Sequence, residues 1–236
     1  MGKLIEVPRE QEKRRRERIP AIENGDRLSR TEFERRYGAS SVRKAELVEG
    51  VVHVGSPATD DHGSTAQLIN GWLFTYAAST PGVAGGCATT IRLDWDNEVQ
   101  PDGFLRLLPE HGGKCRPTED RFLEGPPEVV VEVAASTASY DLHSKLEAYR
   151  RNGVREYIAV RVWDGELDWL ELRGGVYERL AAGADGLLMS EVFPGLWLDP
   201  AALLRRDAAA VLEALRRGVE SAEHAAFVER IAGKRS

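Results

Sequence analysis

Short apolar stretches recur through the chain at the length of β-strands. In them valine, isoleucine and leucine alternate with polar residues or run together, and glycine or proline stands near most of their ends, as is typical of strands. We therefore predict strands within the segments 45–57, 86–95, 99–108, 127–135, 154–163 and 166–182. Gly50 marks a turn or bulge in the first segment, and Gly174 begins a hairpin turn in the last.

Apolar residues at helical spacing predict helices in most of the remaining regions. The predicted helices cover residues 27–39, 59–82, 141–153 and 200–232. Ser29 caps the first helix, with Glu32 completing a capping box, and Asp60 or Asp61 can cap the second. The last region divides into two helices near Gly218.

The order of these elements predicts an α/β fold of the α+β kind, in which a mixed β-sheet is flanked by helices. The strand, helix and strand between 127 and 163 form a crossover unit, which makes the two strands parallel neighbours. The simplest division is a flexible arm over 1–24, one domain over 25–200 and a C-terminal helical extension over 201–236.

Composition and charge change this picture little. Hydrophobic residues make up 42% of the chain and charged residues 30%, which fits a soluble globular protein. With no membrane-spanning run, no secretory signal and only two cysteines, a cytoplasmic location is expected. A net charge of −6 is unusual for a protein that coats nucleic acid, but a site built of carboxylates is itself acidic. The basic residues between 13 and 18 form either a solvated tail or a phosphate-contacting arm.

Glu132 interrupts a nearly continuous run of valines. In a strand, Val129, Val131 and Val133 point to one face, and Val130 and Glu132 point to the other. The carboxylate is then either buried and paired with a cation, or it faces water on a solvated side of the sheet. We favour the buried, functional alternative, because proteins rarely retain an unpaired buried charge.

Asp102 stands between Pro101 and Gly103. The sequence Pro-Asp-Gly is by itself a turn signature. However, Val99 and Phe104 on either side favour a kinked strand, since proline belongs at a strand edge or bulge and glycine lets a ligand approach closely.

Lys145 lies on the predicted helix that follows Glu132. Leu142, Leu146 and Tyr149 form the apolar stripe of this helix, and Lys145 falls roughly 60° from Leu142, at the margin of the stripe. Its stem can therefore lie along the core while the ammonium reaches the end of a strand. A surface pair with Asp141 is the alternative, and this residue alone does not decide between the two.

Asp102, Glu132 and Lys145 together suit phosphodiester hydrolysis. The two carboxylates could ligate one or two Mg²⁺ ions, with Mn²⁺ as an alternative, and the carbonyl of Val133 could add a ligand from the same strand. A metal ion would lower the pKa of a bound water and stabilise charge on the phosphate. Lys145 could orient that water or neutralise the pentacovalent state.

Other polar residues could complete the site. Only one of Glu46 and Glu49 should face inward, and we favour Glu46 as a third metal ligand, because its neighbours are apolar. His62 could shuttle protons or contact phosphate, or could simply be solvated. His111 and Cys115 have no second pair of ligands in register, so we predict no zinc site. The motifs of nucleotide-binding loops and serine nucleophile elbows do not occur.

A set of short motifs stands in a fixed order along the chain. It consists of ELVEG at 46–50, the helix begun near His62, Pro-Asp at 101–102, Glu-Val at 132–133, D-x-x-x-K-x-x-x-Y from Asp141 to Tyr149, and NGVREY at 152–157. Over roughly residues 26–200 this set resembles the Uma family of restriction-endonuclease-like proteins, a bacterial branch of the PD-(D/E)XK nuclease superfamily.

The resemblance implies a restriction-endonuclease-like mixed sheet with the acids on adjacent strands. It implies Asp102 and Glu132 as metal ligands and Lys145 as the catalytic lysine. In the wider superfamily the lysine stands two residues after the strand acid, where this chain has Ala134, so the resemblance moves the amine to the following helix. A DNA substrate and a homodimer are also expected, because cutting two strands favours two related sites.

Three functions therefore compete. The leading one is an Mg²⁺-dependent endodeoxyribonuclease. A catalytically silent nucleic-acid-binding or assembly module on the same fold is the alternative, favoured by the acidic charge, by Ala134 and by an apolar stripe on the last helices. That stripe consists of Val211, Leu212, Leu215 and Val219. A phosphodiesterase for small nucleotides is the third, and the sequence does not separate it from the first.

Overall fold

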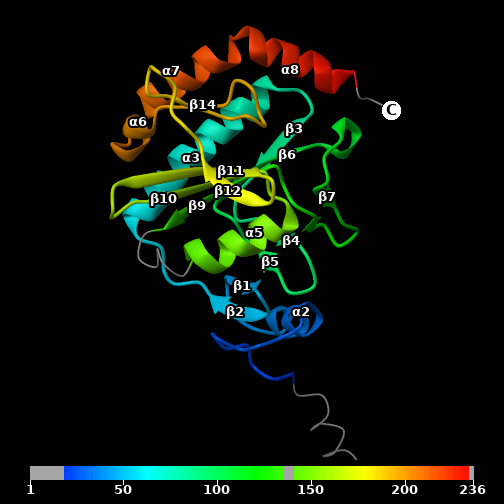
Figure 1. Ribbon diagram of the computed structural model, residues 1–236. Helices are drawn as coiled ribbons and strands as arrows, with labels where there is room; N and C mark the ends of the chain where they lie inside the picture. The colour runs from blue at the N-terminus through cyan, green and yellow to red at the C-terminus, as the bar shows by residue number, and fades with distance from the viewer. Residues whose placement is uncertain (1–18, 135–140, 234–236) are drawn as a thin grey trace, which may run out of the picture.

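The computed structural model describes residues 19–134 and 141–233 (Figure 1). Most of the predicted N-terminal arm therefore lies outside the described residues, as does the cluster of basic residues between 13 and 18. At the described end of that arm, Ile22 is buried against Phe33 and Leu47. Among the described helices, none has the length and apolarity needed to cross a membrane.

A six-stranded mixed sheet lies at the centre of the described structure. In spatial order its strands are β12 (Val176–Arg179), β11 (Glu166–Arg173), β10 (Glu156–Arg161), β9 (Val129–Ala134), β6 (Gly103–Leu107) and β3 (Val83–Gly86). β9 and β10 are parallel, and the other neighbouring strands are antiparallel. The parallel pair is joined through the π-helical turn η2 (Asp141–Lys145) and helix α5 (Leu146–Asn152). The predicted crossover unit and the α+β fold class are both confirmed.

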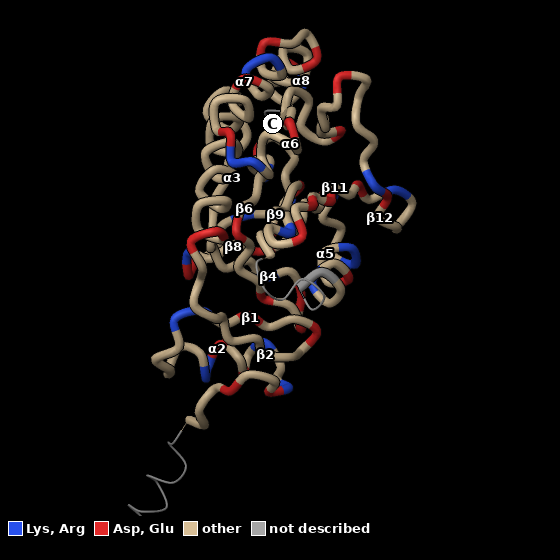
Figure 2. The backbone as a smooth tube through the Cα atoms, turned by 90° about the vertical axis from the view of Figure 1, so that its left-hand side faces the viewer, with Lys and Arg blue, Asp and Glu red and all other residues tan. Residues whose placement is uncertain are grey.

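A second six-stranded sheet contains shorter strands. In spatial order they are β2 (Val51–Val54), β1 (Ala45–Val48), β5 (Glu98–Val99), β4 (Ile91–Arg92), β8 (Leu123–Glu124) and β7 (Arg116–Pro117). β1 and β2 form a hairpin whose turn residues, Glu49 and Gly50, both have positive φ, as tight hairpin turns of this kind require. Figures 1 and 2 place this hairpin and helix α2 (Arg30–Gly38) at one end of the molecule.

The segment predicted as a single strand over 99–108 is divided between the two sheets. Its first residue ends β5 in the second sheet, and the chain then passes through Gln100, Pro101 and Asp102 to begin β6 in the central sheet. The segment predicted as a strand over 86–95 is likewise divided, because Gly86 ends β3 in the central sheet and Ile91–Arg92 form β4 in the second sheet. Asp102 therefore stands at the point where the chain crosses from one sheet to the other.

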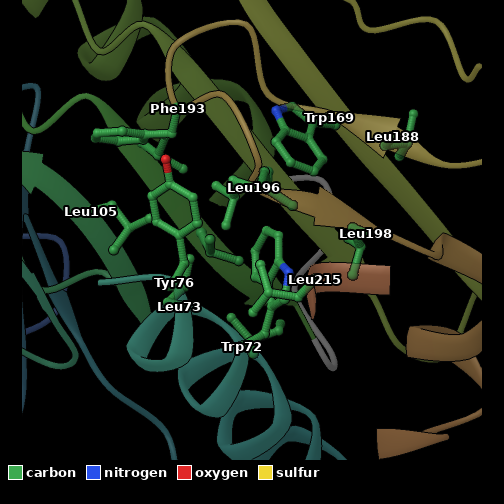
Figure 3. Close-up of a cluster of buried hydrophobic side chains, with 14 of the residues drawn as sticks. Trp72, Leu73, Tyr76, Leu105, Trp169, Leu188, Phe193, Leu196, Leu198 and Leu215 are labelled. Atoms are coloured by element: carbon green, nitrogen blue, oxygen red, sulfur yellow. The ribbon is translucent and has the colours of Figure 1, made fainter. Parts of the chain in front are cut away.

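Helix α3 (Asp60–Ser79) covers one face of the central sheet. Figure 3 shows its apolar side chains inserted between the sheet and the C-terminal segments. Trp72 meets Trp169 edge-on, with ring centroids 5.8 Å apart, and its Nε1 donates to the carbonyl of Trp197. Tyr76 is fully buried and its hydroxyl donates to the carbonyl of Pro194. These aromatic contacts hold α3 against the sheet.

The residues of β9 alternate between two apolar cores, as the valine pattern predicts. Val129, Val131 and Val133 pack on the side of α3, whereas Val130 packs with Tyr149 of α5 and with the second sheet. Glu132 follows Val130 on that second face. Its carboxylate is therefore directed into the space between the two sheets.

The end of the chain is more divided than predicted. It forms the short strand pair β13 (Leu188–Met189) and β14 (Trp197–Leu198), then helices α6 (Pro200–Leu204), α7 (Ala208–Val219) and α8 (Ala222–Ala232). The predicted break near Gly218 is confirmed, because α7 ends at Val219 and α8 begins at Ala222. Gly218 lies inside α7, where a Cβ would come within 2.2 Å of the carbonyl oxygen of Gly195, so glycine serves close packing there. Ser221 separates α7 from α8 by capping the latter.

Two further details of the helices correct the sequence analysis. Thr59, rather than Asp60 or Asp61, caps α3, because its side chain accepts the backbone N–H of His62. In the apolar stripe on α7, Val211 and Leu215 are fully buried in the core and Val219 packs against it, whereas Leu212 is 39% exposed. Most of the stripe is therefore covered by the protein itself, and it gives little support to a partner-binding module.

The long segment after β6 begins with a single 3₁₀ turn, η1 (Pro109–His111), and continues into the β7–β8 hairpin. His111 is buried, and its Nδ1 lies 2.7 Å from the carbonyl oxygen of Ile231 in α8. Cys115 is buried in the core between the sheets. Both side chains therefore belong to the packed interior of the fold.

Glu156 is a buried carboxyl group that should make the stability of the fold depend on pH. Burial raises the pKa of Glu156 to about 7, although hydrogen bonds from Ser190, Val192, Trp169 and Glu191 act to lower it. Since the folded pKa lies above the ordinary value of 4.5, the contribution to stability is present below pH 4.5 and is lost as pH rises to 7. The loss amounts to at most about 3 kcal/mol.

Urea unfolding of the wild type and of Glu156→Gln between pH 4.5 and 8 measures this contribution. The difference between the two free energies of unfolding should change by about 2–3 kcal/mol over that range, because the glutamine cannot titrate. Parallel profiles would show that Glu156 keeps an ordinary pKa in the folded protein.

Candidate active site

A cleft of about 620 Å³ opens between the β1–β2 hairpin and the end of β9. Its walls come from the hairpin, from the segment 55–59 that leads into α3, and from β9, β10 and η2. In Figure 1 the chain rises from β2 to the start of α3 (cyan) along this side of the molecule. The cleft is lined by all of the residues predicted for the site, namely Glu46, Asp102, Glu132, Val133 and Lys145.

Lys145 joins the two buried glutamates of the cleft. Its Nζ lies 2.9 Å from Oε2 of Glu46 and 3.2 Å from Oε1 of Glu132. Lys145 is only 5% exposed, so it does not lie at the surface as the alternative required, and the side chain of Asp141 lies outside the described part of the chain. The π-helical turn before α5 presents the lysine to the carboxyl half of β9, which explains how an amine from the helix reaches a strand acid.

Two more hydrogen bonds fix these glutamates. The hydroxyl of Tyr149, one helical turn after Lys145, donates to Oε1 of Glu132 at 2.7 Å. The backbone N–H of Gln100 donates to Oε1 of Glu46 at 2.6 Å. Tyr149 was expected only in the apolar stripe. The spacing of Lys145 and Tyr149, four residues apart, is the signal that both could face one acceptor.

Burial raises the pKa of Glu132 above its ordinary value. The charge of Lys145 and the hydrogen bond from Tyr149 act to lower it, whereas the charges of Asp102 and Glu46 raise it further. A carboxylate in this position is electrostatically costly. A further cation near Glu132 would therefore be strongly favoured by the site.

Asp102 closes the outer side of the cleft. Its Oδ2 accepts the backbone N–H of Val133 at 2.9 Å, and its main-chain carbonyl accepts Nδ2 of Asn70 in α3. Its Oδ1 lies 3.6 Å from Nε2 of His62 and 3.7 Å from Nζ of Lys44. The carboxylate is thus held from the crossing between the two sheets against the strand that carries Glu132.

The pKa values of Asp102 and His62 are both shifted by their surroundings. Burial acts to raise the pKa of Asp102, but His62, Lys44 and the N–H of Val133 outweigh it, so that the pKa lies below the ordinary value. The side chain of Asp102 in turn raises the pKa of His62, and the carbonyl of Val133 contributes in the same direction. Asp102 is accordingly ionised at neutral pH.

The structure also separates the two candidates for a third carboxylate. Glu46 is buried in the cleft, whereas Glu49 sits in the hairpin turn and pairs with Arg151 outside the cleft.

Lys44 is a cleft residue that the sequence patterns did not indicate as part of the site. It stands two residues before Glu46, and in an extended segment that spacing places two side chains on one face, which could have indicated it.

The acidic groups of the cleft are of the kind that binds a divalent metal ion. Within residues 19–134 and 141–233, no three acidic, histidine or cysteine side chains are close enough together to hold one ion as they stand. The ammonium of Lys145 lies between Glu46 and Glu132 instead. Two carboxylates that already converge on a cation, with Asp102 in the same cleft, fit the hard oxygen ligands that Mg²⁺ and Mn²⁺ prefer.

Comparisons with known proteins bear on the family and the fold of the chain. The model of the Uma2 family, described as "Putative restriction endonuclease", matches residues 30–201. Among solved structures, a "putative nuclease belonging to DUF820" from Anabaena variabilis ATCC 29413 is similar with a TM-score of 0.51 and 10% sequence identity, over 72% of this chain and 97% of that chain. At this identity the likeness shows the fold alone. No curated protein matches the chain.

Proposed function

The chain belongs to the Uma2 family of restriction-endonuclease-like proteins, and on that premise we propose that it is an Mg²⁺-dependent endonuclease that hydrolyses phosphodiester bonds in DNA. The observation that carries the proposal is the convergence of Glu46, Asp102, Glu132 and Lys145 in one cleft, from four separate segments of the chain. A cleft with three carboxylates and one buried lysine has no structural need for so many charges, because each of them is costly to bury.

We assign the metal-binding role to Asp102 and Glu132, with Glu46 and the carbonyl of Val133 as additional oxygen ligands. A bound Mg²⁺ or Mn²⁺ ion would supply the activation of water and the neutralisation of phosphate charge. Asp102 is fixed by the N–H of Val133 and by the hydrogen bond from Asn70 to its main chain. That rigidity suits a group whose task is to position a reactant.

Lys145 is the catalytic lysine in this proposal. Its ammonium is buried between Glu46 and Glu132, and Tyr149 fixes the second of these by donating to its carboxylate. It can stabilise the negative charge that develops on a phosphate, because a positive charge acts strongly in a site that excludes water. It would release one of its two glutamates when that glutamate binds the metal ion.

The first test is cleavage of supercoiled plasmid DNA with Mg²⁺, with Mn²⁺ and with EDTA. We expect nicked and then linear DNA with either metal ion and intact plasmid with EDTA. The same protein is offered single-stranded RNA and a small diester, bis-p-nitrophenyl phosphate, to separate DNA cleavage from other phosphodiester hydrolysis. Equal cleavage in EDTA would contradict the metal requirement, and turnover of the small diester alone would contradict the DNA substrate.

The homodimer expected from the sequence remains part of the proposal. Cleavage of both strands calls for two related sites, which a two-fold dimer supplies. The ratio of linear to nicked plasmid at early times reports on this, since a single site releases nicked plasmid first. A light-scattering mass near that of one chain, together with early linear product, would contradict the dimer.

A further inference from the structure

The outer side of the cleft carries two cationic or hydrogen-bond-donating side chains that the proposed catalytic set leaves unused. Lys44 and His62 approach the same oxygen of Asp102, at 3.7 and 3.6 Å. Both distances exceed those of a good hydrogen bond, so neither donor is fully satisfied by that carboxylate. Lys44 reaches the position from just before β1 and His62 from the first turn of α3, and both residues line the cleft.

Lys44 is held in place by the segment that leads into α3. Its main-chain carbonyl accepts the N–H of Gly55 at 2.9 Å, and its stem lies against the same glycine. A Cβ at Gly55 would come within 3.2 Å of Cβ and Cγ of Lys44. The side chain is 39% exposed, so its stem is guided by the protein while its ammonium is accessible at the mouth of the cleft.

The charges of the cleft also set Lys44 apart. Three carboxylates, those of Glu46, Asp102 and Glu132, would be balanced by Lys145 together with one divalent cation. Lys44 carries a positive charge beyond that balance. Its side chain is also far more exposed than those of the three carboxylates and Lys145. An anion that enters from solvent would meet Lys44 before it reaches the buried groups.

We propose that Lys44 and His62 form a phosphate-binding pair, which holds a backbone phosphate of the DNA at the mouth of the cleft. The inference rests on the proposed function and names the residues that position its substrate. A phosphodiester has two non-bridging oxygens, and the pair offers two donors that lie close together because both approach Oδ1 of Asp102. These are positioning residues, and the chemistry itself belongs to the groups deeper in the cleft.

Binding of a fluorescein-labelled 24-base-pair duplex tests the pair without relying on turnover. Anisotropy is measured between 50 and 200 mM salt for Lys44→Ala, Lys44→Arg and the wild type, each in EDTA. We expect Lys44→Ala to weaken binding about tenfold and to reduce the slope of log K against log salt by about 0.9, the value for one lost phosphate contact. Lys44→Arg should keep the slope of the wild type.

Three more variants sharpen the test. Lys114→Ala removes an exposed lysine outside the cleft and should leave the slope unchanged. Gly55→Ala keeps every charge but displaces the stem of Lys44, so it should weaken binding by a smaller factor. His62→Gln, which keeps an N–H donor, should bind better than His62→Ala. Where cleavage is measurable, Lys44→Ala should raise KM and leave kcat nearly unchanged.

The outcomes separate this inference from the proposed function. Duplex binding that depends on Lys44, without cleavage in any metal ion, would support the pair and remove the endonuclease. Cleavage by a Lys44→Ala variant with an unchanged salt slope would overturn the pair and keep the endonuclease.

Two further results would also overturn the phosphate-binding pair. The first is an unchanged slope together with weaker Mn²⁺ binding by calorimetry, since Lys44 would then serve only to orient Asp102. Binding of inorganic phosphate that depends on Lys44, with duplex affinity unaffected, would assign the pair to free phosphate and overturn it as well.

Discussion

Replacing Glu132 by glutamine is expected to lower metal-dependent DNA cleavage by about 10³-fold while the protein remains folded. Glutamine has the same shape, and its carbonyl oxygen can still accept the hydroxyl of Tyr149 and the ammonium of Lys145. What it lacks is the negative charge. In the proposed site that charge holds the metal ion against the phosphate, so the loss should appear in kcat/KM.

The fold should tolerate this change because the carboxylate of Glu132 is costly where it stands. Burial raises its pKa, so a neutral side chain avoids part of the desolvation penalty. We expect the free energy of unfolding to change by no more than about 1 kcal/mol. Urea unfolding of the variant measures this directly and shows whether lost cleavage reflects lost chemistry or lost structure.

Glu49→Gln is the matched control for Glu132→Gln. Glu49 belongs to the same hairpin as Glu46, but its carboxylate pairs with Arg151 outside the cleft. Its removal should leave cleavage within about twofold of the wild type, as is usual for an exposed ion pair. Wild-type cleavage by Glu132→Gln, or an equal loss in both variants, would remove Glu132 from the proposed site.

Local sequence patterns predicted the orientation of Glu132, and for Lys145 they allowed the observed position without deciding for it. The alternation of valines in β9 predicts which face Glu132 shares with Val130, because side chains in a strand alternate strictly. The position of Lys145 at the margin of an apolar stripe predicts that its ammonium can reach a strand end. Both predictions depend only on the geometry of one regular element, and the structure brings the two side chains together.

The same reasoning could not place Asp102 or Lys44. Asp102 lies on irregular backbone where one predicted strand divides between two sheets, and no periodicity applies there. The contact between Lys44 and Asp102 joins residues from the β1–β2 hairpin and from the entry to β6, and it depends on how the two sheets pack. Such contacts between distant segments are set by tertiary structure, which local patterns do not encode.

The C-terminal helices show the same limit of local patterns. A glycine in a helical stretch suggests an end, because it is a poor helix former, and a break does lie between Val219 and Ala222. Gly218 itself remains within α7, at a point where the helix backbone comes close to Gly195. The requirement for glycine there comes from a contact with another segment, which propensity does not predict.

Replacing Lys145 by methionine is expected to abolish cleavage and also to destabilise the protein by about 3–5 kcal/mol at pH 8. Methionine retains much of the buried stem, so the change chiefly removes the charge. Glu46 and Glu132 would then face each other, both nearly fully buried, without the ammonium that lies between them. Breaking a buried ion pair from one side is costly because the remaining charges have no partner.

A double variant and a metal titration separate this effect from ordinary loss of packing. In the double variant Glu132→Gln/Lys145→Met one of the unbalanced carboxylates is gone, so it should be more stable than Lys145→Met alone. A divalent cation can supply the missing positive charge to the same two glutamates. Mg²⁺ should therefore raise the urea midpoint of Lys145→Met more than that of the wild type, by the linkage between binding and folding. Equal shifts in both proteins would mean that the ion does not bind where Lys145 stands, and the metal-binding role of Glu46 and Glu132 would fail with it.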